Sequence, residues 1–294
     1  MKTLIEIFNN HLDNGRKVLS YEHPGCGMIK NQVMREIADE LVYYLLRGEL
    51  YSDDLHVRIN YNKPTSSQGN RKLKGIIYMA SHPLIDCYLD GLNRQQPSCT
   101  GLNNWCYVFR DFFYKSFGKQ LSMFRNSLLY ILDPKRAEQE ICDWIDTNMH
   151  KFVPDSHGEV AFRTDEAGDF TYCLSMWLNI VERYAGTNLK FYGYTKQFDL
   201  INTVQYNINT THDNFEILVS DSTKDDPNPV TKLRENYGSF GINFRDPELT
   251  PDRVKALVNS PNSNRFRCPG AKAGCFHCAK CPRNENQHLF CEEH

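Results

Sequence analysis

The chain has 294 residues, of which 40% are hydrophobic and 24% are charged, and this composition is typical of a soluble globular protein. Its formal net charge of −2 excludes a global positive field that would attract nucleic acid. No apolar run reaches the length of a membrane span, and the beginning of the chain lacks the apolar stretch of a secretory signal. Without a signal, eleven cysteines favour metal or redox chemistry in the cytoplasm over a disulfide framework.

The beginning of the chain predicts two helices and a short strand. Residues 3–14 have the spacing of an amphipathic helix, and residues 29–48 repeat apolar side chains at helical spacing up to Gly48, which is a helix stop. Residues 55–61 alternate between apolar and polar side chains, as a strand does. We interpret residues 1–73 as an N-terminal helical extension.

From residue 74 onward, strands alternate with helices. Strands are predicted at residues 74–81, from 158, and at 189–196, 203–209, 215–222 and 239–244. Helices are predicted at residues 117–132, 134–150, 170–186, 229–238 and 250–260. This alternation is typical of an α/β sheet or barrel with mostly parallel strands, and residues 74–260 are interpreted as its core. In such folds, reactive groups collect where the strands end.

Charged residues follow two of these strands. Asp165, Glu166 and Asp169 share one loop, and Lys196 follows the next strand directly. Neighbouring carboxylates can raise one pKa and act as an acid–base pair, or they can hold a divalent cation. Asp169 has a second interpretation as the cap of a helix that begins at Phe170. We predict Asp165, Asp169 and Lys196 as catalytic residues, with a solvated surface side chain as the alternative for Lys196.

Residues 261–294 form a cysteine-rich tail that predicts a metal centre. Cys275, Cys278 and Cys281 lie within seven residues, and Cys268 precedes them, so four thiols are available for one site. The even Cys-x2-Cys-x2-Cys step, followed by a proline, favours an iron–sulfur cluster of the 4Fe-4S type. Zinc is the alternative, because it takes four cysteine or histidine ligands. Further candidate ligands for zinc are His277, His288, Cys291 and His294.

A second cysteine group, Cys87, Cys99 and Cys106, lies in a long segment after the strand at 74–81. Three thiolates with an open fourth position suit a catalytic cluster or a substrate-binding iron. The two cysteine groups form either one shared site or two separate sites, and a shared site requires both groups on the same face of the fold. Two other cysteines fall on predicted helices and are interpreted as buried apolar side chains, namely Cys142 and Cys173.

Several short motifs occur together in one order. They are Cys106-Tyr107, Arg125-Asn126, Gly168-Asp169-Phe170, a Trp177-containing helix, Phe191-Tyr192-x-Tyr194-Thr195-Lys196, and Cys268-Pro269 before the cysteine cluster. Together they resemble the phage gene-product-eighty-eight family over roughly residues 74–282. The resemblance implies a phage-type protein in the host cytoplasm and a distant relationship to radical-SAM barrels. It therefore implies a partial TIM-like barrel, with a cysteine loop at the barrel mouth.

The chain lacks the Cys-x3-Cys-x2-Cys signature of radical-SAM enzymes, so the use of SAM is left open. The first functional hypothesis is an iron–sulfur enzyme that acts on a nucleotide, a nucleic acid or an amino-acid-derived substrate. The alternative is a non-enzymatic, zinc-stabilised module that binds nucleic acid or protein. Neither hypothesis involves a membrane.

Overall fold

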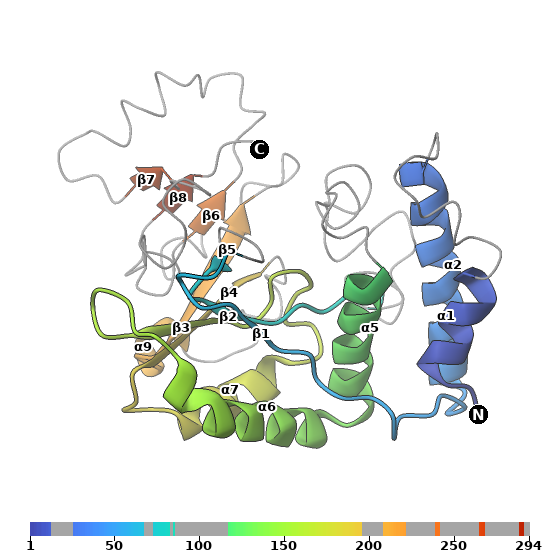
Figure 1. The fold of residues 1–294 in the computed structure, drawn as a ribbon, viewed down its shortest axis with the longest axis horizontal. Coiled ribbons are helices and arrows are strands. Elements are labelled where there is room, and N and C mark those ends of the chain that lie inside the picture. Colours follow the sequence, from blue (N-terminus) through green and yellow to red (C-terminus); the bar gives the residue numbers. More distant parts are fainter. Residues whose placement is uncertain are drawn as a thin grey trace. The chain divides into compact units, whose positions relative to one another are not determined.

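The computed structural model describes residues 1–12, 26–67, 73–82, 85, 117–195, 208–221, 239–241, 265–267 and 288–290. The helices are α1 (Leu4–Leu12), α2 (Cys26–Leu46), α5 (Phe117–Leu132), α6 (Pro134–Asn148), α7 (Leu174–Arg183) and α9 (Ile208–Thr211), with a three-ten turn at Met149–Lys151. The strands are β1 (Asn60–Tyr61), β2 (Ile77–Tyr78), β3 (Val160–Arg163), β4 (Leu189–Thr195), β5 (Phe215–Asp221), β6 (Ser239–Gly241), β7 (Arg265–Arg267) and β8 (His288–Phe290) (Figure 1).

The chain divides into two compact units, each assembled from separate stretches of sequence. The helical unit comprises Met1–Arg58, Ala80–Ile141 and Ala167–Met176. The sheet unit comprises Ile59–Met79, Cys142–Glu166 and Trp177–His294. Helices α6 and α7 contribute residues to both units. The three-part division predicted from the sequence, with boundaries near residues 73 and 260, remains a prediction.

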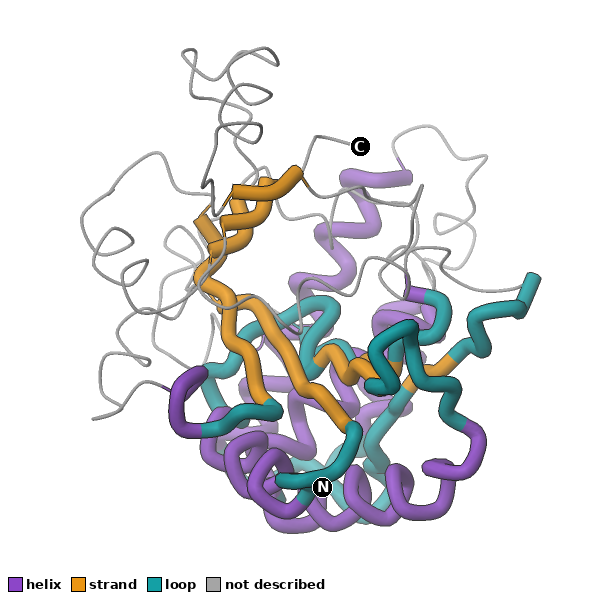
Figure 2. The backbone as a smooth tube through the Cα atoms, turned by 90° about the vertical axis from the view of Figure 1, so that its left-hand side faces the viewer, coloured by secondary structure: helices purple, strands orange, loops and turns teal. Residues whose placement is uncertain are grey.

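One sheet contains the described strands in the order β1-β2-β3-β4-β5-β6-β8-β7, drawn in orange in Figure 2. Every neighbouring pair is parallel except β1 with β2. Strands β2 to β6 lie side by side in chain order, as barrel strands do, whereas a doubly wound sheet reverses its order at one point. The predicted α/β class with mostly parallel strands is therefore confirmed. Closure into a TIM-like barrel remains a prediction.

One face of the sheet packs against α7. Phe162 of β3 and Phe191 of β4 lie beside Trp177, with ring centroids 5.5 and 6.3 Å from the Trp177 ring. The hydroxyl of Tyr184, the residue directly after α7, donates to the Cys142 carbonyl of α6 at 3.1 Å, which joins the end of α7 to α6. Cys142 and Cys173 are both buried free thiols, as the sequence predicts.

The opposite face of the sheet is also buried, and it is rich in tyrosine. Its core cluster consists of Leu73, Ile76, Tyr78, Ala161, Tyr192 and Leu218. Register pairs Tyr78 with Arg163 and Arg163 with Tyr192, so these three side chains share this face. A parallel sheet covered on both sides matches the general behaviour of such sheets. The polar groups on this face lie next to the ends of the strands.

In the helical unit, the beginning of α1 is held by a capping box. The Thr3 hydroxyl accepts the Glu6 N–H at 3.1 Å, and the Glu6 carboxylate accepts the Thr3 N–H at 2.8 Å. The helix then buries Phe8 against Phe124 of α5, with ring centroids 5.4 Å apart. The N-terminal helix predicted at residues 3–14 is thereby confirmed over Leu4–Leu12, and residues 13–14 lie outside the described residues.

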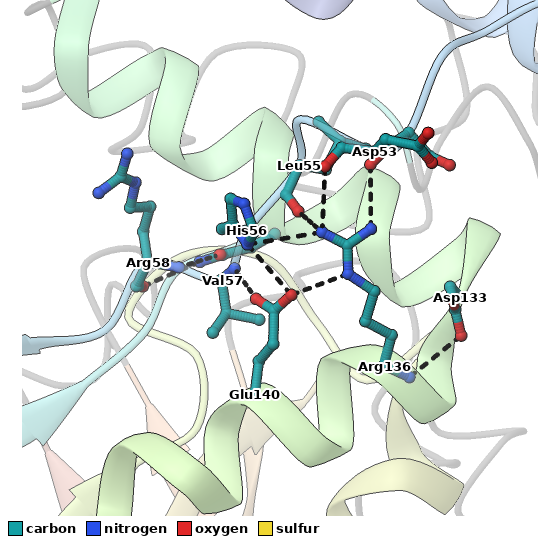
Figure 3. A network of polar contacts seen from close by, with 10 residues as sticks. Asp53, Leu55, His56, Val57, Arg58, Asp133, Arg136 and Glu140 are labelled. Atoms are coloured by element: carbon teal, nitrogen blue, oxygen red, sulfur yellow. Dashed lines mark hydrogen bonds and ion pairs between the residues drawn. The ribbon is translucent and has the colours of Figure 1, made fainter. Parts of the chain in front are cut away.

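The strand predicted at residues 55–61 is wrong except for β1. Upstream of β1, the Arg136 guanidinium of α6 donates to the Leu55 carbonyl and pairs with Glu140 at 2.8 Å (Figure 3). The second carboxylate oxygen of Glu140 accepts the Val57 N–H at 2.9 Å. Side chains of α6 therefore occupy the backbone groups that a strand ladder needs.

Replacing Glu140 with alanine tests this side-chain network. We expect the free energy of unfolding to fall by about 1–3 kcal/mol, because the Val57 N–H and the Arg136 guanidinium lose a charged acceptor. Urea unfolding measures the change. Lys135→Ala, an exposed position on the same helix, is the matched control and should change the value by less than about 0.5 kcal/mol. Equal losses in the two variants would contradict the importance of the network.

Candidate functional site

Among the predicted site residues, the structure describes Asp165 and Asp169. The others lie outside the described residues, namely Lys196, Cys87, Cys99, Cys106, Cys268, Cys275, Cys278 and Cys281. Asp165 is 3% exposed and belongs to the sheet unit, whereas Asp169 is 8% exposed and belongs to the helical unit. Both carboxylates are therefore buried, and their catalytic roles remain predictions.

Five residues of the sheet unit gather where β2, β3 and β4 end, and we call them the carboxyl-edge cluster: Tyr78, Arg163, Asp165, Glu166 and Tyr194. The Arg163 guanidinium lies over the Tyr194 ring, 4.8 Å from its centroid. It donates to the backbone carbonyls of Asp165 and Glu166, each at 3.1 Å. One cation therefore fixes the backbone of the loop that carries both carboxylates.

Backbone hydrogen bonds continue the sheet beyond the formal end of β3. The Thr164 N–H donates to the Tyr192 carbonyl at 2.9 Å, and the Met79 N–H donates to the Arg163 carbonyl at 3.1 Å. The Glu166 N–H then donates to the Met79 carbonyl at 2.6 Å. The loop is thus held on one side by the segment that follows β2 and on the other side by β4. These bonds fix the backbone positions from which its carboxylates extend.

The charge state of Tyr78 follows from its surroundings. Burial, together with the smaller effect of the negative charge of Glu166, raises the pKa of the Tyr78 hydroxyl to about 12. The phenol therefore keeps its proton at neutral pH and is a hydrogen-bond donor. With a guanidinium and two carboxylates beside it, the cluster can bind a polar substrate and exchange a proton with it.

The helical unit holds a second group of buried polar side chains, directly after β2. The His82 ring is fully buried, and it stacks on Phe124 with centroids 3.8 Å apart and planes 8° from parallel. Its Nε2 lies 2.5 Å from the Gln120 side-chain oxygen, which only accepts, so Nε2 carries the proton. The His82 N–H donates to the Ser127 hydroxyl at 2.6 Å, and the Asn126 amide donates to the Ala80 carbonyl at 2.8 Å.

These contacts anchor the chain immediately before the segment that carries the second cysteine group. Gln120, Phe124 and Ser127 all come from α5, at helical spacing, so one face of this helix provides the anchor. Sequence reasoning missed His82, because a single histidine after a strand has no periodic signal. It also missed Tyr78 and Arg163, whose proximity depends on strand register.

The Gly168-Asp169-Phe170 motif has a direct physical explanation. Gly168 has φ of +94°, and a Cβ at this position would overlap the Ser81 hydroxyl and approach the Ser81 Cβ to 2.9 Å. The Ser81 N–H donates to the Ala167 carbonyl at 2.8 Å, which brings the two loops of the helical unit together. Only glycine fits both the backbone conformation and this close approach.

Asp169 binds the turn that follows, and its carboxylate accepts the Phe170 N–H at 2.8 Å. The helix predicted from residue 170 is wrong at its beginning, because α7 begins at Leu174 and residues 171–173 form a turn. Asp169 therefore acts as an acceptor for a turn before the helix. This contact uses one carboxylate oxygen and is compatible with the predicted catalytic role.

The arrangement defines an α/β protein whose buried polar residues follow the ends of parallel strands. A family model described as gene product 88 matches residues 87–293, so the chain belongs to the gene product 88 family. This confirms the resemblance to the phage gene-product family drawn from the sequence motifs. No curated protein and no solved structure matches the chain.

Two searches of the described part of the chain gave negative results. No described helix is long and apolar enough to cross a membrane. In the described ranges, no three histidine, cysteine, aspartate or glutamate side chains are arranged to hold a metal ion.

The close approach at Gly168 can be tested by substitution. Gly168→Ala should lower the free energy of unfolding by about 2–4 kcal/mol, because the new methyl group overlaps Ser81 and the backbone has positive φ. Gly186→Ala is the control, since Gly186 also has positive φ (+75°) but has open space around it. It should cost only about 1 kcal/mol. Chemical denaturation measures both, and equal costs would contradict the role of the Ser81 contact.

The buried His82 predicts a specific pH dependence of stability. The unfolded chain has a histidine pKa near 6.5, whereas burial lowers the pKa of His82 in the folded protein to about 3. Between these values only the unfolded chain binds this proton. The contribution to stability is therefore complete above about pH 6.5 and is lost as the pH falls toward 3, with a slope of up to about 1.4 kcal/mol per pH unit.

The measurement is the free energy of unfolding between about pH 7 and pH 4. A double variant, His82→Phe with Gln120→Leu, should have a shallower slope than the wild type, because it removes the titrating ring and its acceptor together. His157→Gln changes an exposed histidine and should keep the wild-type slope. An unchanged slope in the double variant would show that His82 does not control acid stability.

Proposed function

We propose that this protein binds an iron–sulfur cluster of the 4Fe-4S type through the cysteines of its C-terminal segment. The proposed ligands are Cys268, Cys275, Cys278 and Cys281. Four thiolates are the donor set that such clusters take, and the short even spacing lets neighbouring cysteines reach one cluster. The positions of two strand ends in the sheet unit give this proposal additional support.

Strands β7 and β8 end directly before cysteines. The last residue of β7 is Arg267, which precedes Cys268, and the last residue of β8 is Phe290, which precedes Cys291. Arg267 and Phe290 are partners in the parallel pair. Because neighbouring strands are about 5 Å apart, the chain leaves the sheet toward both cysteines from adjacent positions, which supports a common centre and adds Cys291 as a candidate ligand.

The same sheet edge supports an enzymatic role. Strands β2 to β8 are parallel, so their carboxyl ends meet at one edge, which is where the carboxyl-edge cluster lies. In this proposal Arg163 and Tyr78 orient a polar substrate, and Asp165 handles protons. Catalytic roles are proposed as well for Lys196 and, in the helical unit, for Asp169. A bound iron–sulfur cluster would supply one-electron chemistry. The substrate classes are a nucleotide, a nucleic acid or an amino-acid-derived compound.

Chain order within the sheet supports the related proposal of a partial, radical-SAM-like barrel. Consecutive parallel pairing of β2, β3, β4, β5 and β6 is the winding that such a barrel requires. Cys87, Cys99 and Cys106 follow the segment anchored by His82, and they are proposed as ligands of the same cluster or of a second one. The proposed setting is the cytoplasm of a phage-infected host cell. Whether SAM takes part is a separate question for the purified protein.

Anaerobic purification of the full chain tests the cluster. We expect a brown protein with broad absorbance near about 400 nm and with iron and acid-labile sulfide in equal amounts. Cys275→Ser should lose most of the iron. Cys142→Ser is the matched control, because Cys142 is a buried thiol on α6, and it should keep the iron.

A colourless protein that carries stoichiometric zinc under strict anaerobiosis would overturn the iron–sulfur proposal and favour the zinc-stabilised binding module. Cys99→Ser separates one site from two. Loss of about half of the iron in this variant indicates two clusters, whereas complete loss in both Cys99→Ser and Cys275→Ser indicates one shared cluster.

A further inference from the structure

Two arginines of the helical unit come from neighbouring backbone positions, and neither guanidinium has a hydrogen bond or ion pair among the described residues. They are Arg58, which ends the segment leading to β1, and Arg125 on α5. Arg58 is exposed and Arg125 is partly buried. Neighbouring cations without an ion pair repel each other, which opposes folding.

The Asn126 side chain explains why these arginines stay together. Its oxygen accepts the Arg58 N–H at 2.7 Å, and its amide nitrogen donates to the Arg58 carbonyl at 3.2 Å. The same nitrogen donates to the Ala80 carbonyl at 2.8 Å. The residue next to Arg125 therefore fixes the backbone of Arg58, and it ties both to the segment that follows β2.

Three other arginines of the described part of the chain use their guanidinium groups within the protein. Arg136 pairs with Glu140, Arg163 binds two backbone carbonyls, and Arg183 pairs with Asp146 at 2.9 Å. Figure 3 shows the Arg58 side chain directed away from the carboxylate of Glu140, which accepts the N–H of the preceding residue, Val57. Arg58 is thus left outside the network that surrounds it.

Electrostatics around Arg125 favour the arrival of a negative charge. Burial lowers the pKa of Arg125, and the nearby positive charge of Arg58 lowers it further. The carboxylate of Asp54 acts in the opposite direction but more weakly than Arg58 does. The attraction of Asp54 therefore offsets only part of the repulsion that Arg58 exerts at Arg125.

We propose that Arg58 and Arg125 together bind a phosphate group of the substrate. Guanidinium groups present planar pairs of N–H donors that match phosphate oxygens, and two of them balance a doubly negative phosphate. The substrate class rests on the proposed function, whereas the site itself rests only on the arginine pair. The phosphate belongs either to a free nucleotide or to a nucleic-acid strand.

Binding to the full-length protein tests the proposal. The probes are inorganic pyrophosphate, a nucleoside triphosphate and a fluorescein-labelled single-stranded twelve-nucleotide DNA, measured by calorimetry and fluorescence anisotropy. At least one probe should bind the wild type, and Arg58→Gln or Arg125→Gln should weaken its binding at least about tenfold. Arg183→Gln removes an exposed arginine outside the pair and should leave binding unchanged.

Thermal unfolding separates this role from a structural one. Without a probe, Arg125→Gln should unfold at the same temperature as the wild type or higher, because the variant removes a repulsion. Loss of binding with unchanged or increased stability supports the site. Loss of binding together with a clear decrease in unfolding temperature overturns it. The proposal is also overturned if the Arg58→Gln/Arg125→Gln double variant binds as well as the wild type.

The salt dependence of binding distinguishes the two sources of phosphate. A labelled strand should bind with a slope in log salt that falls by about 1 for each arginine removed. A free nucleotide should bind independently of strand length and should be displaced by pyrophosphate. Binding of no probe by the wild type overturns the proposal.

Iron content makes the failure of this inference distinguishable from failure of the proposed function. Arg125→Gln should contain as much iron as the wild type, because the arginine pair is not a ligand. A protein that contains zinc instead of iron, but binds phosphate through both arginines, would overturn the cluster and leave the phosphate site intact. A protein that contains the cluster but binds none of the three probes would overturn the phosphate site and leave the cluster proposal intact.

Discussion

Parallel pairing of consecutive strands is the constraint on which the rest of this structure depends. Because β2, β3, β4, β5 and β6 are neighbours in chain order, every connection must return from one sheet edge to the other. All segments that leave these strands therefore start from the same edge. In the sequence, the residues that follow these strands include the loop at residues 164–169 and Lys196, and β7 and β8 are each followed by a cysteine. Parallel pairing is what gives each of them a possible role at this edge.

Buried polar groups at this edge are satisfied mainly by backbone. In the sheet unit, Arg163 donates to two backbone carbonyls, and in the helical unit, Asn126 binds the backbone of Arg58 and Ala80. Such contacts remove the cost of burying the backbone amide and carbonyl groups. The Asp165 and Glu166 carboxylates are therefore positioned by hydrogen bonds of the backbone around them. A site built in this way keeps its geometry when a ligand changes the local charge.

The sequence predicts correctly those elements that are stabilised by interactions within the element itself. Residues 117–132 were predicted as a helix and form α5 with the same bounds, because apolar spacing and the following proline act within the element. The strand at 55–61 failed because Arg136 and Glu140 from a distant helix occupy its backbone groups. Strands β7 and β8 are three residues long and carry no period that sequence could reveal. Only the acidic loop of the candidate site is predictable from the sequence. Tyr78 and Arg163 are brought together by strand register, and His82 meets its partners by packing against α5.

Helix α5 shows how one regular element can serve stability and recognition at once. Its inner face, with Gln120, Phe124 and Ser127, holds His82 and the chain that follows β2. At the next positions around the helix, Asn126 fixes a backbone segment and Arg125 leaves a positive charge without a partner among the described residues. A helix selected for stability alone would place a neutral side chain beside Arg58, because repulsion between the two cations opposes folding. A bound anion would relieve this repulsion, which is the role proposed for the arginine pair.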